Sequence, residues 1–90
     1  MSETDLEITR KRLLWRATHR GIKEMDILVG GYAQHHLDTM DEAELTQFAE
    51  LLEIPDQDLL SWATNQSAVP PPQQSAMLDG VLRFRPEGNL

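Results

Sequence analysis

Residues 10–28, RKRLLWRATHRGIKEMDIL, contain the end of one predicted helix and the beginning of the next. Gly21 stands at the junction, where a helix often ends on a residue with a left-handed backbone, a conformation that glycine adopts at little cost. Glu24 and Asp26 follow, and acidic side chains stabilise the N-terminal end of a helix. The stretch therefore predicts two consecutive helices that meet at Gly21.

Apolar residues recur at helical spacing through most of the chain, and no stretch shows the sustained alternation of a half-buried strand. In the first predicted helix, Leu13, Leu14 and Ala17 face inward. Four more helices are expected at residues 22–36, 41–53, 55–63 and 73–84. The predicted fold class is therefore all-α, a small five-helix bundle with a helical core at about residues 4–84 and a flexible tail at residues 85–90.

Some positions predict where helices begin and how closely they pack. Ser2 or Thr4 can cap the first helix, and residues 41–44, DEAE, match a capping box that opens the third. Gly30 and Gly31 lie inside the second helical pattern, where each costs about 1 kcal/mol of helix propensity. They indicate either close packing against a neighbour or a local break.

The 90-residue chain carries a net charge of −7 and has no cysteine. Six of its eight Lys and Arg residues lie at positions 10–23, whereas positions 24–80 hold eleven Asp and Glu and no Lys or Arg. This acidity opposes non-specific binding to polyanions, and the lack of cysteine excludes thiolate chemistry. Acidic residues near the start argue against a secretory signal or transit peptide, and no apolar stretch suits a membrane span. We therefore expect a single-domain cytoplasmic protein that does not insert into membranes.

Residues 20–24, RGIKE, which we call the corner, have two interpretations. In the structural one, the chemistry of helix ends alone accounts for a cation, a glycine and an acid at this junction. In the functional one, Gly21 lets another backbone approach, while Arg20 and Glu24 extend outward as a donor and an acceptor for a partner protein. The residues of the corner are compatible with both.

A basic row leads away from the corner along the first predicted helix. It consists of Arg12, Arg16, Arg20 and Lys23, with Trp15 beside it. Because the row begins well before the end of the helix, the helix dipole does not explain it alone. This observation favours the functional interpretation.

Three other kinds of site fit less well. Recognition of nucleic acid is disfavoured because the second helix carries one Lys and two acids, whereas a recognition helix needs donors. Enzyme activity is not expected, because His19 lacks an obvious Ser or Cys partner. The Asp and Glu residues are also placed as helix caps and solvated helix faces and do not form a catalytic pair. No metal site is expected either, because adjacent helical side chains diverge by about 100°. The candidate metal ligands are His35, His36, Asp38 and Asp41.

Five segments together resemble the FAD assembly factors of succinate dehydrogenase, also called flavinylation factors. The segments are residues 12–16 (RLLWR), 20–24 (RGIKE, the RGxxE motif), 26–28 (DIL), 51–53 (LLE) and 55–62 (PDQDLLSW). The RGxxE motif alone is weak, but with the two Trp-containing segments at this separation it is specific. The resemblance covers about residues 10–63. His19 departs from it, since relatives often have another Arg there, and Gly30-Gly31 replace bulkier residues.

The resemblance implies a five-helix bundle that binds the flavoprotein subunit of succinate dehydrogenase, and in some bacteria that of fumarate reductase. It implies that the protein promotes covalent attachment of FAD to this client without being the catalyst, and that FAD is bound by the client. A monomer is expected. The alternative is an adaptor or antitoxin-like module whose client is not a flavoprotein. The motif places the client interface at Arg20, Gly21 and Glu24, with Arg12, Arg16, Lys23 and Asp26 as neighbours.

Overall fold

A computed structural model describes residues 3–85, which form five α-helices, two short 3₁₀ turns and no strand. The elements are α1 (Glu3–Thr18), α2 (Lys23–His36), η1 (Leu37–Thr39), α3 (Glu42–Leu51), α4 (Asp56–Ala63), η2 (Pro71–Gln73) and α5 (Ala76–Arg83). The predicted all-α fold of five helices is confirmed. No helix in this part of the chain is long and apolar enough to cross a membrane.

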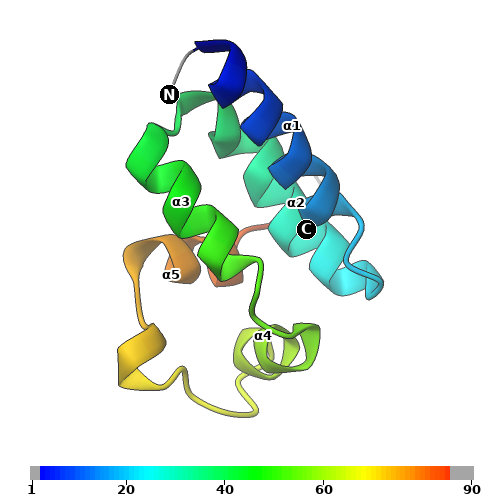
Figure 1. Cartoon of the computed structure of the whole chain (residues 1–90). Helices are drawn as coiled ribbons and strands as arrows, with labels where there is room; N and C mark the ends of the chain where they lie inside the picture. The colour runs from blue at the N-terminus through cyan, green and yellow to red at the C-terminus, as the bar shows by residue number, and fades with distance from the viewer. Residues whose placement is uncertain (1–2, 86–90) are drawn as a thin grey trace.

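Helix α2 is the central element of the bundle. It packs along α1 and also contacts α4 and α5, while α3 contacts α1 (Figure 1). Met25, Val29 and Ala33 recur at spacings of four on its inner face and are at most 1% exposed. Burying such side chains contributes about 1.5–3 kcal/mol each for the larger ones. The end of α2 near residue 23 is therefore held in place by its own buried stripe.

The later helices complete the core around α2. Phe48 from α3 and Leu59 from α4 are completely buried, and Leu78 from α5 is 2% exposed. Trp62 of α4 is 8% exposed and closes the core on that side. The capping box predicted at residues 41–44 is confirmed. The Asp41 side chain accepts from the Glu44 backbone N–H, and the Glu44 side chain accepts from the Asp41 backbone N–H.

Gly30 and Gly31 do not break α2 but serve close packing. A Cβ at Gly30 would lie 2.9 Å from Cγ2 of Thr18 in α1, and one at Gly31 would overlap the ring of Phe84. Of the two alternatives that the sequence left open, close packing is confirmed. Helix α1 therefore lies nearer to α2 than a larger residue at Gly30 would allow.

Some predicted helix ends were wrong. Helix α1 ends at Thr18, before the corner. The Thr18 hydroxyl donates to the Leu14 carbonyl at 2.8 Å. The fifth helix begins at Ala76 and not near residue 73, because the Ser75 side chain accepts the Leu78 N–H as its N-cap. Thr4 lies inside α1 and does not cap it. The Ser2 cap and all but the first residue of the predicted tail lie outside the described residues.

Candidate functional site

The corner, residues 20–24, forms an exposed turn between α1 and α2. Gly21 has φ +97°, the left-handed backbone that its sequence position predicts. A Cβ placed there would have no heavy atom within 4 Å. Lys23 and Glu24 are exposed in the first turn of α2. The turn therefore presents a bare backbone at Gly21 with one cation and one anion next to it.

The prediction that the Arg20 side chain extends outward was wrong. Its Nε donates to Oδ1 of Asp56 at 2.7 Å, and its Nη1 and Nη2 donate to the carbonyls of Leu52 and Ile54 at 2.7 and 2.6 Å. Only 9% of the side chain is exposed. The physical reason is that the segment between α3 and α4 offers a carboxylate and two carbonyls in an arc that fits the five donors of a guanidinium.

Asp26 holds the same residue from the other side. Its Oδ1 accepts a hydrogen bond from the backbone N–H of Arg20 at 2.6 Å. Arg20 is therefore fixed both at its backbone, by α2, and at its side chain, by the segment of residues 52–56. Hydrogen bonds to a charged group contribute about 1.5–3 kcal/mol each. We conclude that Arg20 and Asp26 position the corner, whereas Gly21, Lys23 and Glu24 form its exposed surface.

Sequence reasoning missed Asp56 as part of this site. The sequence alone places Asp56 only at the start of the fourth predicted helix, inside the resembling segment at residues 55–62. Its carboxylate is 19% exposed and also pairs with Arg20, 36 positions earlier in the chain. One signal in the sequence could have indicated this contact: residues 55–62 and the corner both belong to the segments that resemble the same family. The pairing of Arg20 with Asp56 gives a physical reason why the two segments occur together.

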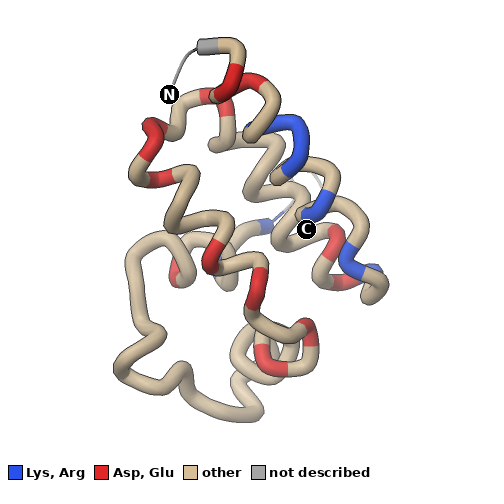
Figure 2. Tube along the Cα trace, viewed as in Figure 1, with Lys and Arg blue, Asp and Glu red and all other residues tan. Residues whose placement is uncertain are grey.

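The basic row differs along its length. Arg12 is exposed, whereas Arg16 forms an ion pair with Glu53. Figure 2 shows most Lys and Arg positions gathered along α1 and the turn after it, while Asp and Glu positions are spread over all the helices. Arg10, outside the predicted row, donates to the carbonyls of Leu37 and Met40 at 3.1 and 2.9 Å. Among the described residues, the positive charge near the corner that is not already paired with an acid therefore comes mainly from the exposed side chains of Arg12 and Lys23.

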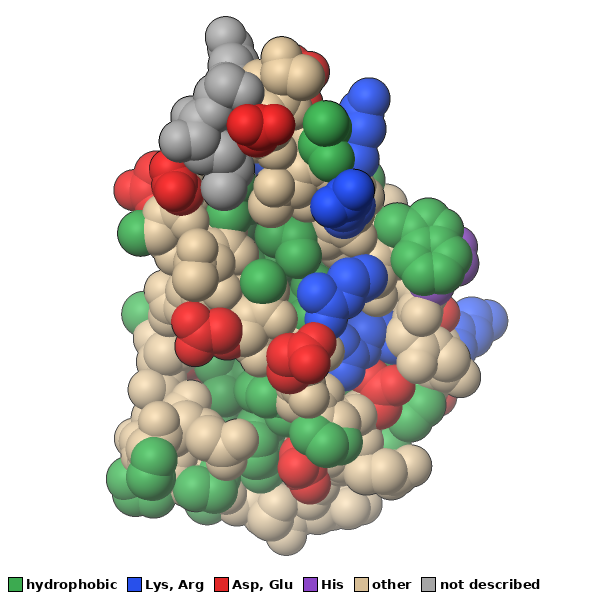
Figure 3. Space-filling model, viewed as in Figure 1, with side chains coloured by type: hydrophobic (Ala, Val, Ile, Leu, Met, Phe, Trp, Pro, Cys, Tyr) green, Lys and Arg blue, Asp and Glu red, His purple; other side chains and the backbone are tan. Residues whose placement is uncertain are grey.

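Trp15 is the most exposed large apolar side chain among the described residues, at 62%. Its ring stacks on that of His19, with centroids 4.3 Å apart and planes 10° from parallel. Next to them is a hollow of about 350 Å³. Figure 3 shows the Lys and Arg side chains of this face grouped beside a large apolar side chain and His. The hollow is lined by Trp15, Arg16, His19, Arg20, Leu52, Glu53, Ile54, Pro55 and Asp56.

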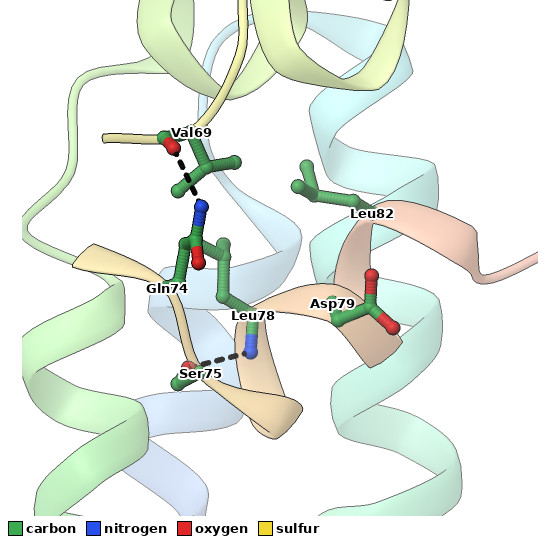
Figure 4. A pocket seen from close by; sticks show the side chains of 6 residues that line it. All are labelled: Val69, Gln74, Ser75, Leu78, Asp79 and Leu82. Carbon is green, nitrogen blue, oxygen red and sulfur yellow. Dashed lines mark hydrogen bonds between the residues drawn. The ribbon is translucent and has the colours of Figure 1, made fainter. Parts of the chain in front are cut away.

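A larger hollow, of about 500 Å³, lies between the proline-rich connector and α5 (Figure 4). Two of its polar groups serve the fold: the Gln74 amide donates to the Val69 carbonyl at 3.0 Å, and Ser75 caps α5. Asp79, at its edge, pairs with Arg83. Size alone does not make this hollow the better candidate, because the corner combines open backbone with exposed charges of both signs.

The histidines of α2 are placed for packing. His35 lies against the ring of Phe84 with centroids 5.2 Å apart, and His36 lies against Tyr32 at 4.3 Å. Within residues 3–85 no three His, Asp or Glu side chains come together as metal ligands would. Burial, with a smaller contribution from the charge of Glu44, raises the pKa of Tyr32 above its usual 10.0. This tyrosine lies away from the corner.

Comparison with known proteins gives a consistent result. A family model described as flavinator of succinate dehydrogenase matches residues 11–85. The FAD assembly factor SdhE of Acetobacter pasteurianus is 40% identical over 78 residues, which cover 87% of this chain and 72% of that protein. The mitochondrial succinate dehydrogenase assembly factor 2 of Danio rerio is 37% identical over 81 residues, 88% of this chain and 51% of that protein.

The equivalent factor of Scheffersomyces stipitis is 41% identical over 66 residues, 73% of this chain and 44% of that protein. The chain thus spans about half the length of these two mitochondrial relatives. The match of the family model runs from α1 to the residue after Phe84, so it includes the corner and the segment that holds Arg20. The chain therefore belongs to the flavinator family of succinate dehydrogenase.

Proposed function

We propose that this chain binds the flavoprotein subunit of succinate dehydrogenase and promotes covalent attachment of FAD to a histidine of that subunit. The observation that carries the proposal is the family match over residues 11–85, supported by a relative named as an FAD assembly factor. The alternative, an adaptor or antitoxin-like module with a non-flavoprotein client, is not favoured by this match. The exposed corner lies within the matched region and is the proposed interface.

The geometry suggests a division of roles within the proposed interface. Gly21 offers a bare backbone that a client segment can approach closely, and Glu24 and Lys23 offer an acceptor and a donor beside it. Arg20 and Asp26 keep this turn in one conformation, which lowers the entropy cost of binding. Arg12 adds positive charge along α1, which favours encounter with an acidic client surface. Arg16 lies next to it on the same helix but is already paired with Glu53.

We propose that the chain acts as a helper and that the client supplies both the flavin and the histidine. Gly30 and Gly31 are packed inside α2 against Thr18 and Phe84, so they do not form a phosphate-binding turn. The hollow beside the corner is lined in part by Arg20 and Asp56, which already form an ion pair with each other. This arrangement suits docking of a protein surface better than enclosure of a dinucleotide.

The proposed mechanism is a population shift. The bundle would bind one arrangement of the client's domains more tightly than the others and so hold histidine and flavin in reactive geometry. A ligand shifts such an equilibrium only by the difference in its affinity for the two states. The corner, being rigidly held, can recognise one arrangement selectively.

The test uses purified apo-flavoprotein with FAD and dicarboxylate at physiological concentration, with and without this chain. Covalent flavin is followed by in-gel fluorescence of the large subunit. We expect faster flavinylation with the chain present, and a smaller gain with a Gly21→Arg variant shown to be folded by circular dichroism. Equal rates with and without the unaltered chain would refute the proposal.

Three finer statements belong to the same proposal. The flavoprotein subunit of fumarate reductase is a second client, the chain acts as a monomer, and it acts in the cytoplasm. The first is tested by the same flavinylation assay with that subunit. Sedimentation of the free chain tests the second, since a stable dimer would sediment at twice the mass, and fractionation of native cells tests the third.

A further inference from the structure

One face of α1 remains uncovered by the rest of the described fold. Ile8, Arg12 and Trp15 follow one another at spacings of four and three, which places them on one side of α1. His19, the residue after the end of the helix, continues this face because its ring stacks on Trp15. We call this face the α1 stripe. Ile8 is 44% exposed, and Leu13 and Ala17 of the same helix face the core at 4% and 0%. The stripe is therefore the solvent-exposed face of a helix whose opposite face is buried in the core.

The aromatic group of the stripe is held in a fixed orientation. His19 stacks on Trp15, and its Nδ1 lies 2.7 Å from the Trp15 carbonyl and 3.0 Å from Oγ1 of Thr18. These contacts restrict the imidazole and, through the stack, the indole. A pre-oriented tryptophan loses little rotamer freedom on binding, and Trp is among the residues most enriched at the energetic centres of interfaces.

The charge around this tryptophan is positive, in a chain whose net charge is −7. Arg12 and Lys11 are exposed, and within residues 3–85 no hydrogen bond or ion pair engages either side chain. By contrast, Arg16 is paired with Glu53 and Arg20 with Asp56. The α1 stripe thus joins an oriented apolar ring to cations that are available to a partner.

We propose that the α1 stripe is a second contact strip of the client interface, with Trp15 inserting into an apolar pocket of the flavoprotein subunit whose rim is acidic. This inference rests on the proposed function, and it adds the chemistry of the partner surface. The hollow beside Trp15 is also lined by Arg20 and Asp56, so the strip is continuous with the corner. Insertion of the indole and docking at Gly21 therefore belong to one binding event.

A membrane surface is the competing partner for a basic face with a tryptophan. The α1 stripe contains only two large apolar side chains, Ile8 and Trp15, which is narrow for a helix that lies in a bilayer interface. The neighbouring hollow also makes this surface concave, and a flat layer of lipid headgroups does not fit a concave surface. A protein with a complementary pocket is the better fit.

The experiment measures binding of the full chain to the purified flavoprotein subunit by calorimetry, for Trp15→Ala, Trp15→Phe, Arg12→Gln and Arg83→Gln. We expect Trp15→Ala to weaken binding at least about tenfold, and Trp15→Phe to recover part of the loss. Arg12→Gln should weaken binding more at low than at high salt. Arg83→Gln, which removes one exposed charge on α5, is the matched control and should bind like the unaltered chain.

A second readout is independent of affinity. Trp15 is exposed and Trp62 is 8% exposed, so acrylamide should quench mainly Trp15 in the free chain and much less in the complex. Trp15→Phe identifies the contribution of Trp62. Unchanged quenching in the complex, or an unaltered affinity of Trp15→Ala, would overturn the inference while leaving the proposed function in place.

Two further outcomes are decisive. If the unaltered chain does not bind the subunit at all, the proposed function fails and this inference fails with it. If the unaltered chain binds vesicles of phosphatidylserine and phosphatidylcholine and Trp15→Ala does not, the stripe is a membrane contact and the inference is wrong. No binding to these vesicles supports the protein partner.

Discussion

Arg20 and Asp56 are joined by a 2.7 Å hydrogen bond between Nε and Oδ1, although 36 positions separate them in the sequence. Only 9% of the Arg20 side chain is exposed. A guanidinium in such a place loses its hydration and depends on the groups that face it. This pair therefore connects the corner to the segment between α3 and α4.

The first prediction concerns this pair. Asp56→Asn should lower the free energy of unfolding by about 1–3 kcal/mol, because Arg20 keeps its two carbonyl acceptors but loses the opposite charge. Asp58→Asn, in the same first turn of α4, is the control and should cost about 0.3–1 kcal/mol through the helix dipole alone. Urea denaturation measures both. Equal losses would show that Asp56 contributes only to the dipole.

The pairing of Arg16 with Glu53 gives a useful contrast. Its side chains are 41% and 75% exposed, so water screens the attraction between them. Glu53→Gln should therefore cost about 0–1 kcal/mol. In the same urea series we expect the Glu53→Gln variant to be more stable than the Asp56→Asn variant. The reverse order would contradict the idea that burial makes the Arg20–Asp56 pair the stronger one.

Substitution at Gly21 separates backbone strain from partner binding. Gly21→Ala should destabilise the chain by about 1–2 kcal/mol because φ is +97°. Gly21→Asn should cost less, since Asn tolerates the left-handed region. Both add a Cβ to the bare turn, so both should weaken binding to the flavoprotein subunit. A Gly21→Asn variant with unaltered affinity would remove Gly21 from the interface.

Glu24 tests the exposed acceptor of the corner. Glu24→Ala should lower the free energy of unfolding by only about 0.3–1 kcal/mol, the dipole contribution of an acid in the first turn of α2. If it accepts a hydrogen bond from the client, affinity should fall about tenfold or more. Asp79→Ala, in the first turn of α5, is the matched control. Calorimetry distinguishes them, and similar affinities for the two variants would count against a contact at Glu24.

The two adjacent glycines of α2 should respond differently to alanine. A Cβ at Gly30 would lie 3.2 Å from the Ala17 carbonyl and 3.3 Å from Cα of Thr18, so the α1 backbone must move. We expect a net loss of about 1–3 kcal/mol. At Gly31 the obstacle is the ring of Phe84 at the end of α5, which can swing aside, so the gain of about 1 kcal/mol in helix propensity should leave the stability near neutral. Thermal unfolding of both variants checks the order.

Tyr32 predicts the alkaline behaviour of the fold. Its pKa is raised in the folded state from 10.0, chiefly by burial. The folded state therefore holds this proton more tightly than the unfolded state does, so the contribution to stability is complete below pH 10 and is lost as the pH rises through the folded pKa. Tyr32→Phe should flatten the fall in stability above pH 10. A fall of equal slope in the variant would assign it to other groups.

The sequence predicted the helices and Gly21 correctly because those features depend on local chemistry. Helical spacing of apolar residues, the capping box at residues 41–44 and the left-handed glycine are all decided within a few positions. The direction of the Arg20 side chain is not local. It depends on two carbonyls and a carboxylate at residues 52–56, and no periodicity in the sequence reports where backbone carbonyls will point.

The anchoring of Arg20 by residues 52–56 limits how far this protein can be shortened. A synthetic peptide of the first two helices would contain the whole RGxxE motif, yet it would lack the carboxylate and both carbonyls that fix the arginine. Its guanidinium would be hydrated and mobile, and the turn would sample many shapes. An inhibitor based on this protein would therefore need a covalent constraint at the turn, or a scaffold that supplies an equivalent cradle for the arginine.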